Sequence, residues 1–170
     1  MYNIDELKRI LLQSNWDKIK EAISKSDVNE FDKFGNNILH FYIKERDNIK
    51  VDYKKIIDLL ISNGLNIEGK RYNKYIYGTV LQLALIRKQK DIFDYLLELG
   101  AEVDATNSYG SSTLLIAVMN YYNGDGYYIE KLIQKGADIY KSNHNGISPI
   151  SLAYSFDNND AKKFFPTIEN

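Results

Sequence analysis

Apolar residues recur at helical spacing in short segments along this chain, and each segment follows a turn. A stripe of apolar residues three and four apart is typical of a helix with one buried face. Four segments share a glycine, a short polar residue and then such a stripe: residues 31–43, 74–85, 108–118 and 144–154. The short polar residues predict helix N-caps, because their side-chain oxygens accept an early backbone N–H, at Asn37, Thr79, Ser112 and Ser148.

A second amphipathic segment trails the first three, and it ends at a glycine each time. These segments are residues 56–67, 94–104 and 130–140, and the evenly spaced glycines are Gly64, Gly100 and Gly136. A residue without Cβ ends a helix at low cost in the left-handed conformation. The pattern therefore predicts a repeated unit of turn, helix, short loop and second helix, in about 33 residues plus insertions.

Both ends of the chain predict altered versions of this unit. Residues 4–25 form a helix pair that lacks the turn motif, and Phe164 and Phe165 stand at the apolar positions of a last second helix before Pro166. Stacked repeats bury one continuous core, and altered end units keep such an array soluble. We therefore expect a single all-α solenoid of five helix pairs, divided as 1–30, 31–67, 68–104, 105–141 and 142–170.

The repeated unit resembles the ankyrin repeat over nearly the whole chain. That repeat begins turn–Gly–x–Thr-Pro-Leu-His-x-Ala and ends Leu-Leu-x-x-Gly-Ala-Asp. The matching residues are His40, Pro149, the alanines at 84, 117 and 153, Gly100-Ala101 and Gly136-Ala137-Asp138. The resemblance implies β-hairpin loops between the helix pairs, such as 27–35 and 103–110. It also implies a non-catalytic protein-binding module whose partner meets the concave side, built from hairpin tips and first helices.

Composition narrows the function classes further. The chain has 170 residues, a net charge of −1 and no cysteine, so disulfides, thiolate metal sites and Cys nucleophiles are excluded. No apolar run approaches the roughly 20 residues that span a bilayer. The first ten residues are acidic and amphipathic, unlike a secretory signal. We expect a cytoplasmic protein that is monomeric, because both ends of the array are capped.

Two stretches that could be taken for a phosphate site and a calcium site are better interpreted as helix ends and turns. Gly64, Gly69 and Lys70 match the spacing of a nucleotide-binding loop, but such a loop follows a strand and ends in Ser or Thr, where this chain has Arg71. A helix-stop glycine followed by a turn glycine explains the spacing. Residues 120–130 lack the acidic pattern of a calcium loop. We therefore predict no cofactor and no metal.

The two histidines and the dispersed carboxylates do not predict an active site. His40 stands at the structural histidine of the repeat, and His144 is expected at an exposed hairpin tip, where it would contact a partner. No catalytic signature of the common hydrolase, zinc-protease or kinase type is present. Carboxylates such as Asp91 and Asp94 are expected on a solvated outer helix face. The protein is predicted not to be an enzyme.

A basic, tyrosine-rich stretch lies between Glu68 and Asp91 without any acidic residue. It contains Lys70, Arg71, Lys74, Arg87, Lys88 and Lys90, with Tyr72, Tyr75 and Tyr77. Tyrosines can stack bases, so nucleic-acid binding through residues 70–90 is one interpretation. The near-neutral net charge argues against it, and Tyr and Arg are also the residues that dominate protein interfaces. Protein recognition is therefore favoured.

By position in the repeat, the resemblance implies which side chains a partner would meet. Apolar residues at exposed positions have no explanation in the repeat's own core, apart from packing between neighbouring hairpins. The predicted partner-binding residues are Phe34, Lys70, Arg71, Tyr72, Tyr75, Ile76, Arg87, Tyr109, Met119, Tyr121, Tyr122, His144 and Phe156. Tyr127 and Tyr128 either extend this aromatic surface or begin the following helix. The predicted partner is a protein with an acidic surface and apolar anchor points.

Three hypotheses for the biological role follow from this surface. The first is a stoichiometric inhibitor or a toxin-immunity protein that occupies a partner's active surface. The second is a viral or bacterial effector that captures a host protein. The third is nucleic-acid binding through the basic segment, and the net charge disfavours it.

Overall fold

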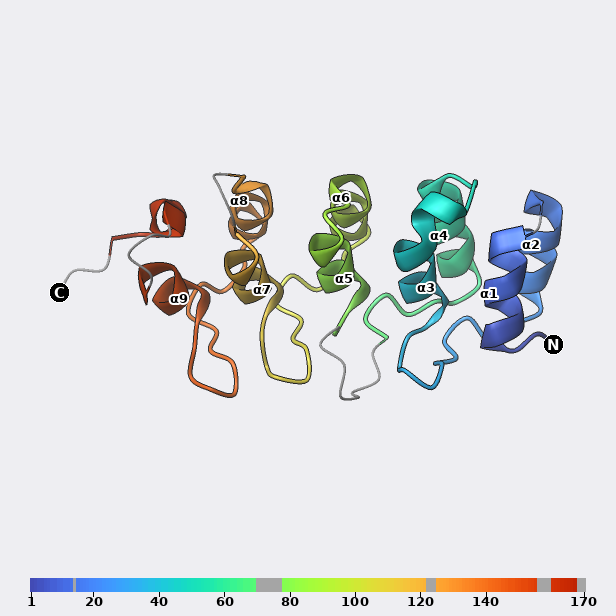
Figure 1. Ribbon diagram of the computed structural model, residues 1–170, viewed down its shortest axis with the longest axis horizontal. Helices are drawn as coiled ribbons and strands as arrows, with labels where there is room; N and C mark the ends of the chain where they lie inside the picture. The colour runs from blue at the N-terminus through green and yellow to red at the C-terminus, as the bar shows by residue number, and fades with distance from the viewer. Residues whose placement is uncertain (14, 70–77, 122–124, 156–159, 168–170) are drawn as a thin grey trace.

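The protein is a row of helix pairs stacked from the N-terminus to the C-terminus, as the predicted solenoid requires (Figure 1). This computed structural model describes residues 1–170 except 14, 70–77, 122–124, 156–159 and 168–170. Over the described residues no strand forms, and isolated bridges join only Tyr2 to Ser26 and Thr106 to Ser112. The elements are α1 (Ile4–Gln13), α2 (Trp16–Ser24), α3 (Ile38–Glu45), the 3-10 helix η1 (Arg46–Asn48), α4 (Tyr53–Ser62), α5 (Val80–Ile86), α6 (Lys90–Glu98), α7 (Thr113–Met119), α8 (Tyr127–Gln134), α9 (Pro149–Ser155) and the 3-10 helix η2 (Asp160–Phe164).

All four predicted N-caps form. The Asn37 side-chain oxygen accepts the backbone N–H groups of Leu39 and His40, both at 3.1 Å. Thr79 forms a reciprocal capping box with Gln82, while Ser112 accepts from Leu115 at 3.2 Å and Ser148 from Ser151 at 3.2 Å. Loss of one such cap costs about 1 kcal/mol. The caps fix where each inner helix begins and hence which of its faces meets the core.

The helix-stop glycines are also confirmed. Gly64, Gly100 and Gly136 have φ values of 87°, 88° and 84°, and added Cβ atoms there would meet no neighbour within 4 Å. Backbone conformation, not space, therefore selects glycine at these positions.

Gly78 is a correction to the predicted alignment. Gly35, Gly110 and Gly146 lie two residues before their caps with positive φ, whereas Gly78 lies immediately before Thr79. A Cβ on Gly78 would lie 2.4 Å from Gln82 Oε1 and 2.7 Å from Asn107 Cα. Close packing against the next hairpin therefore leaves no room for a larger residue at Gly78, which does not stand at the position of the other turn glycines.

One apolar core runs through the stack. The inner helices α3, α5, α7 and α9 contact one another in sequence, α1 precedes them, and the described hairpin loops project to one side of the row (Figure 1). At the C-terminal end the second helix of the last pair is only the 3-10 helix η2, after which Phe165 is 7% exposed. None of the described helices is long and apolar enough to cross a membrane.

The outer helices are joined by polar contacts between neighbouring repeats. The first recognisable repeat carries an insertion between its two helices, within residues 44–55. Arg46 in this insertion donates to both oxygens of Asp91 on α6, and this pairing lowers the pKa of Asp91. The Tyr127 hydroxyl on α8 donates to Asp94. These carboxylates were expected to be merely solvated, and they instead accept hydrogen bonds from adjacent repeats. The first insertion thus has a structural role.

Candidate functional site

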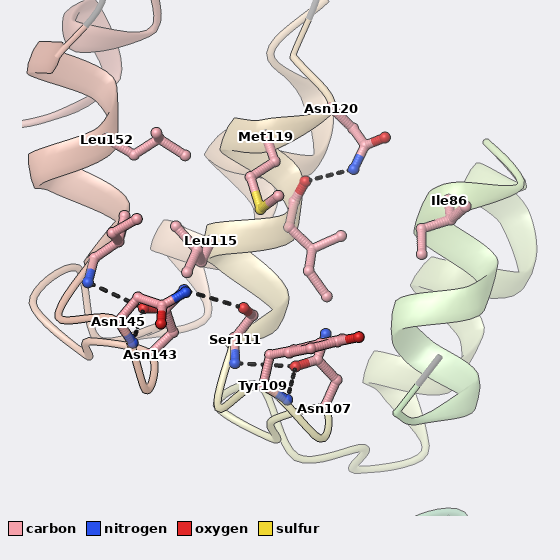
Figure 2. Close-up of a pocket in the computed structure, with 12 residues that line it drawn as sticks. Ile86, Asn107, Tyr109, Ser111, Leu115, Met119, Asn120, Asn143, Asn145 and Leu152 are labelled. Carbon is pink, nitrogen blue, oxygen red and sulfur yellow. Dashed lines mark hydrogen bonds between the residues drawn. The ribbon is translucent and has the colours of Figure 1, made fainter. Parts of the chain in front are cut away.

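A groove of about 480 Å³ lies where the last two hairpins meet the inner helices α5, α7 and α9 (Figure 2). Its volume falls within the usual range for ligand-binding pockets, roughly 300–1,000 Å³. The side chains come from three successive repeats: Ile86, Asn107, Tyr109, Ser111, Leu115, Ile116, Met119, Asn120, Asn143, Asn145, Ile147 and Leu152. No ionisable acid or base is among them, apart from the phenol of Tyr109.

The groove gathers large apolar side chains that solvent reaches. Met119 is 58% exposed, Tyr109 is 49% exposed and Ile147 is 39% exposed. Isolated exposed apolar residues are normal on protein surfaces, whereas a contiguous group of them marks an interaction site. Figure 2 shows Met119 on α7 between Ile86 of α5 and Leu152 of α9.

Asparagines hold the two hairpins at the edge of the groove in fixed shapes. Asn107 Oδ1 accepts the N–H groups of Tyr109 and Ser111 at 2.9 and 3.1 Å. Asn143 Oδ1 accepts those of Asn145 and Ile147 at 2.9 and 3.0 Å. An Asn side chain that bonds to backbone two residues on imposes a turn. The hairpin tips are therefore preorganised to present Tyr109 and Asn145.

One change in the repeat motif alters how the last hairpin is held. The motif position that holds His40 in α3 holds Gln82 in α5, whose Nε2 donates to the carbonyls of Ala105 and Ser111 in the next hairpin, at 2.9 and 3.2 Å. In α7 the same position is Leu115, which has no donor. The last hairpin is tied instead by His144 N–H to the Tyr109 carbonyl at 3.0 Å.

His40 is a structural residue, as predicted. It is 1% exposed, and its Nδ1 lies 2.7 Å from Asn37 Oδ1. Burial, with a smaller contribution from the Lys44 charge, lowers the pKa of His40 to about 4, although Asp32 and a hydrogen bond with the Gly78 backbone oppose the shift. The ring is therefore neutral at pH 7.

The predicted partner-binding residues that the structure describes divide into four groups, of which the last is the buried Tyr121. Tyr109 and Met119 line the groove. Arg87 and His144 are exposed beside the groove. Arg87 follows the groove residue Ile86 at the end of α5. The His144 ring lies over Gly110, and a Cβ added to Gly110 would be 2.7 Å from the Cδ2 atom of His144. Phe34 is 45% exposed on the first hairpin, does not line the groove, and lies with the Lys33 ammonium 5.0 Å from its ring centre.

Tyr121 corrects the prediction, because it is 8% exposed and belongs to the core. Its hydroxyl donates to Asp160 at 2.6 Å, and its ring packs edge-on against Phe164 with centroids 5.5 Å apart. Tyr127 and Tyr128 begin α8, which was the alternative interpretation for them. Lys70, Arg71, Tyr72, Tyr75, Ile76, Tyr122 and Phe156 lie outside the described residues.

The sequence interpretation missed Leu115, Ile147 and Leu152. The sequence carries a signal for two of them, Leu115 and Ile147. Leu115 is apolar where the repeat motif has histidine, and Ile147 is apolar just before its cap, where the earlier hairpins have Asn36 and Ser111. Ile147 puts an exposed apolar side chain where the earlier hairpins have a polar one, whereas Leu115 is fully buried in the wall of the groove.

The other chemical candidates resolve as turns and helix ends. Gly64 ends α4, and the Gly69 N–H donates to the Asn66 carbonyl at 3.0 Å, closing a turn. A nucleotide loop would instead place its glycines between a strand and a helix. In the part of the chain that the structure describes, no three His, Asp or Glu side chains gather at a distance suited to a metal ion.

The capped helix pairs, left-handed glycine stops and projecting hairpins define an α-helical repeat solenoid with a groove on its hairpin and inner-helix side. The profile of the family described as ankyrin repeats (3 copies) matches residues 9–107. The chain therefore belongs to the ankyrin repeat family, whose members generally mediate protein–protein interactions.

A similar protein is the nuclear factor NF-kappa-B p105 subunit of Gallus gallus. It is 30% identical to this chain over 126 residues, which are 71% of this chain and 12% of that protein. The chain thus spans only a small part of the length of this relative, and the similarity supports the family and no shared activity of the whole protein.

Proposed function

We propose that this protein binds a partner protein without catalysis, through its hairpin and inner-helix side, with the groove at its centre. The observation that carries the proposal is the group of three exposed apolar side chains, Tyr109, Met119 and Ile147, on a preorganised frame. Burying large apolar and aromatic side chains in a central pocket is the usual source of affinity at protein interfaces. A rigid frame adds affinity because little entropy is lost on binding.

The proposed partner surface is acidic with apolar anchor points. Arg87 and Lys88 are exposed at the end of α5, and neither forms an ion pair with a described residue. Lys90, by contrast, pairs with Asp125 at 2.9 Å, so part of the predicted basic segment is already neutralised within the protein. This weakens nucleic-acid binding through residues 70–90 as an alternative.

A protein that only occupies a surface acts by blocking or relocating its partner. We therefore propose stoichiometric inhibition, of which toxin immunity is one form, as the biological role. Capture of a host protein by an effector is the second candidate, and both rest on the same groove and on the predicted partner chemistry.

Affinity capture tests the binding function. The full chain, immobilised, is exposed to extract from its native cell, and retained proteins are identified by mass spectrometry. A Tyr109→Ala, Met119→Gln variant should lose the specifically retained partner, because it removes the apolar anchors at exposed positions without opening the core. Tyr140→Ala is the matched control, since Tyr140 is 66% exposed and does not line the groove.

Partner retention is compared with the thermal stability of each variant and with the salt dependence of binding. Thermal unfolding of both variants should stay close to that of the parent. Retention of the same partner by the groove variant would show that the groove is not the binding site. Retained nucleic acid whose binding falls by about 10³-fold or more between 50 and 200 mM salt would support the nucleic-acid alternative instead.

A further inference from the structure

The groove has a defined polarity along the array. Its interior is apolar, its edge carries neutral amides, and its α5 end is basic. Asn145 is exposed at the tip of the last hairpin, and its backbone N–H, not its side chain, makes the turn contact with Asn143. Asn120 Nδ2 donates to the Ile116 carbonyl at 2.8 Å, which leaves its Oδ1 for another donor. Side-chain amides at these places match the hydrogen-bonding groups of a peptide backbone.

Among the described residues, no carboxylate forms an ion pair with Arg87 at the basic end. Arg87 follows the groove residue Ile86, and it occupies the same repeat position as the groove residue Asn120. Burial lowers the pKa of Lys44, and the Arg87 charge adds a smaller contribution in the same direction. Asp32 pairs with Lys8, Asp91 with Arg46 and Asp125 with Lys90, while Glu45 accepts a hydrogen bond from Asn48. Arg87 can therefore pair with a carboxylate of the bound molecule.

We propose that the groove binds an extended segment of the partner protein in which one large apolar side chain is flanked by carboxylates. The apolar side chain lies between Ile86, Met119 and Leu152, and the main chain follows the asparagine edge. A carboxylate pairs with the Arg87 guanidinium, which can bind it through two parallel hydrogen bonds. This inference rests on the proposed function and names the recognised segment.

Four labelled nonapeptides test it by fluorescence anisotropy with the full chain. Each has a central Phe or Ala within a Gly-Ser frame, flanked by two Glu or two Lys residues. The Phe peptide with Glu flanks should bind at least about tenfold more tightly than the Ala–Glu and the Phe–Lys peptides, because both the anchor and the charge contribute.

Two variants separate the anchor from the charge. Arg87→Glu should reverse the preference between Glu and Lys flanks while the preference for Phe over Ala persists. Met119→Gln should reduce the Phe preference while the preference for Glu flanks persists. Lys50→Glu is the control, because Lys50 is exposed in the loop before α4 and does not line the groove.

Several results would overturn the inference. These are equal affinity for Glu-flanked and Lys-flanked peptides, no binding of any peptide up to about millimolar concentration, or unchanged flank preference in Arg87→Glu. Self-association of the chain that Met119→Gln abolishes, measured by sedimentation, would make a second copy the occupant and would also overturn it. If the parent chain captures a partner that the Tyr109→Ala, Met119→Gln variant loses, while the peptides show no charge preference, only this inference fails and the proposed function stands.

Discussion

Acid should destabilise this protein through His40 before its carboxylates titrate. The folded-state pKa of His40 is about 4 and its ordinary value is 6.5, because the buried ring is held neutral. A base with a depressed folded-state pKa contributes stability that is fully present above 6.5 and is lost as pH falls toward 4. The whole difference corresponds to about 3 kcal/mol, of which about 2 kcal/mol is lost between pH 7.5 and pH 5.

The chain itself supplies the matched variant. Gln82 occupies the same repeat position as His40, caps α5 together with Thr79 and donates to the next hairpin. His40→Gln should therefore fold, with a free energy of unfolding at pH 7.5 within about 1 kcal/mol of the parent, a difference typical of a single neutral hydrogen bond. It has no imidazole to protonate, so its stability should fall less on acidification.

The assay is urea unfolding of both proteins at pH 7.5 and pH 5, followed by circular dichroism and by tyrosine and tryptophan fluorescence. The parent should lose about 2 kcal/mol more than His40→Gln between the two pH values. The carboxylates are common to both proteins, so their contribution cancels in the comparison. Equal losses in the two proteins would refute the reasoning that the neutral, buried ring is what acid disrupts.

Three further changes probe backbone, packing and ion pairing, each by urea unfolding at pH 7.5. Lys88 has φ 56°, which favours glycine, so Lys88→Gly should stabilise by about 0.5–1 kcal/mol, and destabilisation would show that the Lys88 side chain contributes contacts that matter more. Gly78→Ala should destabilise by about 1–3 kcal/mol, since its Cβ would meet Gln82 Oε1 at 2.4 Å, and a neutral result would contradict the close packing there. Asp91→Asn removes a partly exposed pair with Arg46 and should cost no more than about 1 kcal/mol, a cost that shrinks with added salt; a larger, salt-independent loss would indicate a buried role.

Much of the fold was predictable because its signals are local. An N-cap needs one side-chain oxygen within its own turn, as at Asn37 and Ser112, and a helix stop needs one residue that accepts positive φ, as at Gly100. Such signals repeat in register, so they predict the helix pairs without knowledge of any long-range contact. The division of the chain into five units with named boundaries stays a prediction.

The errors arose where the cause lies in another repeat. A Cβ on Gly78 would meet Asn107 of the next repeat as well as Gln82 of its own, and the Tyr121 side chain packs against Phe164 and Asp160 from the C-terminal unit. The contacts with Asn107, Phe164 and Asp160 do not follow from the local pattern. That pattern shows an ordinary glycine at position 78 and an apparently exposed tyrosine at position 121.

Local residue patterns were therefore enough for the helices, their ends and the family of the chain. The groove depends on stacking, which brings Ile86, Met119 and Leu152 from three repeats to one place. Whether an apolar residue is buried or exposed depends on which residues of the adjacent repeat pack against it. Those residues are far away in the sequence and come into contact only when the repeats stack.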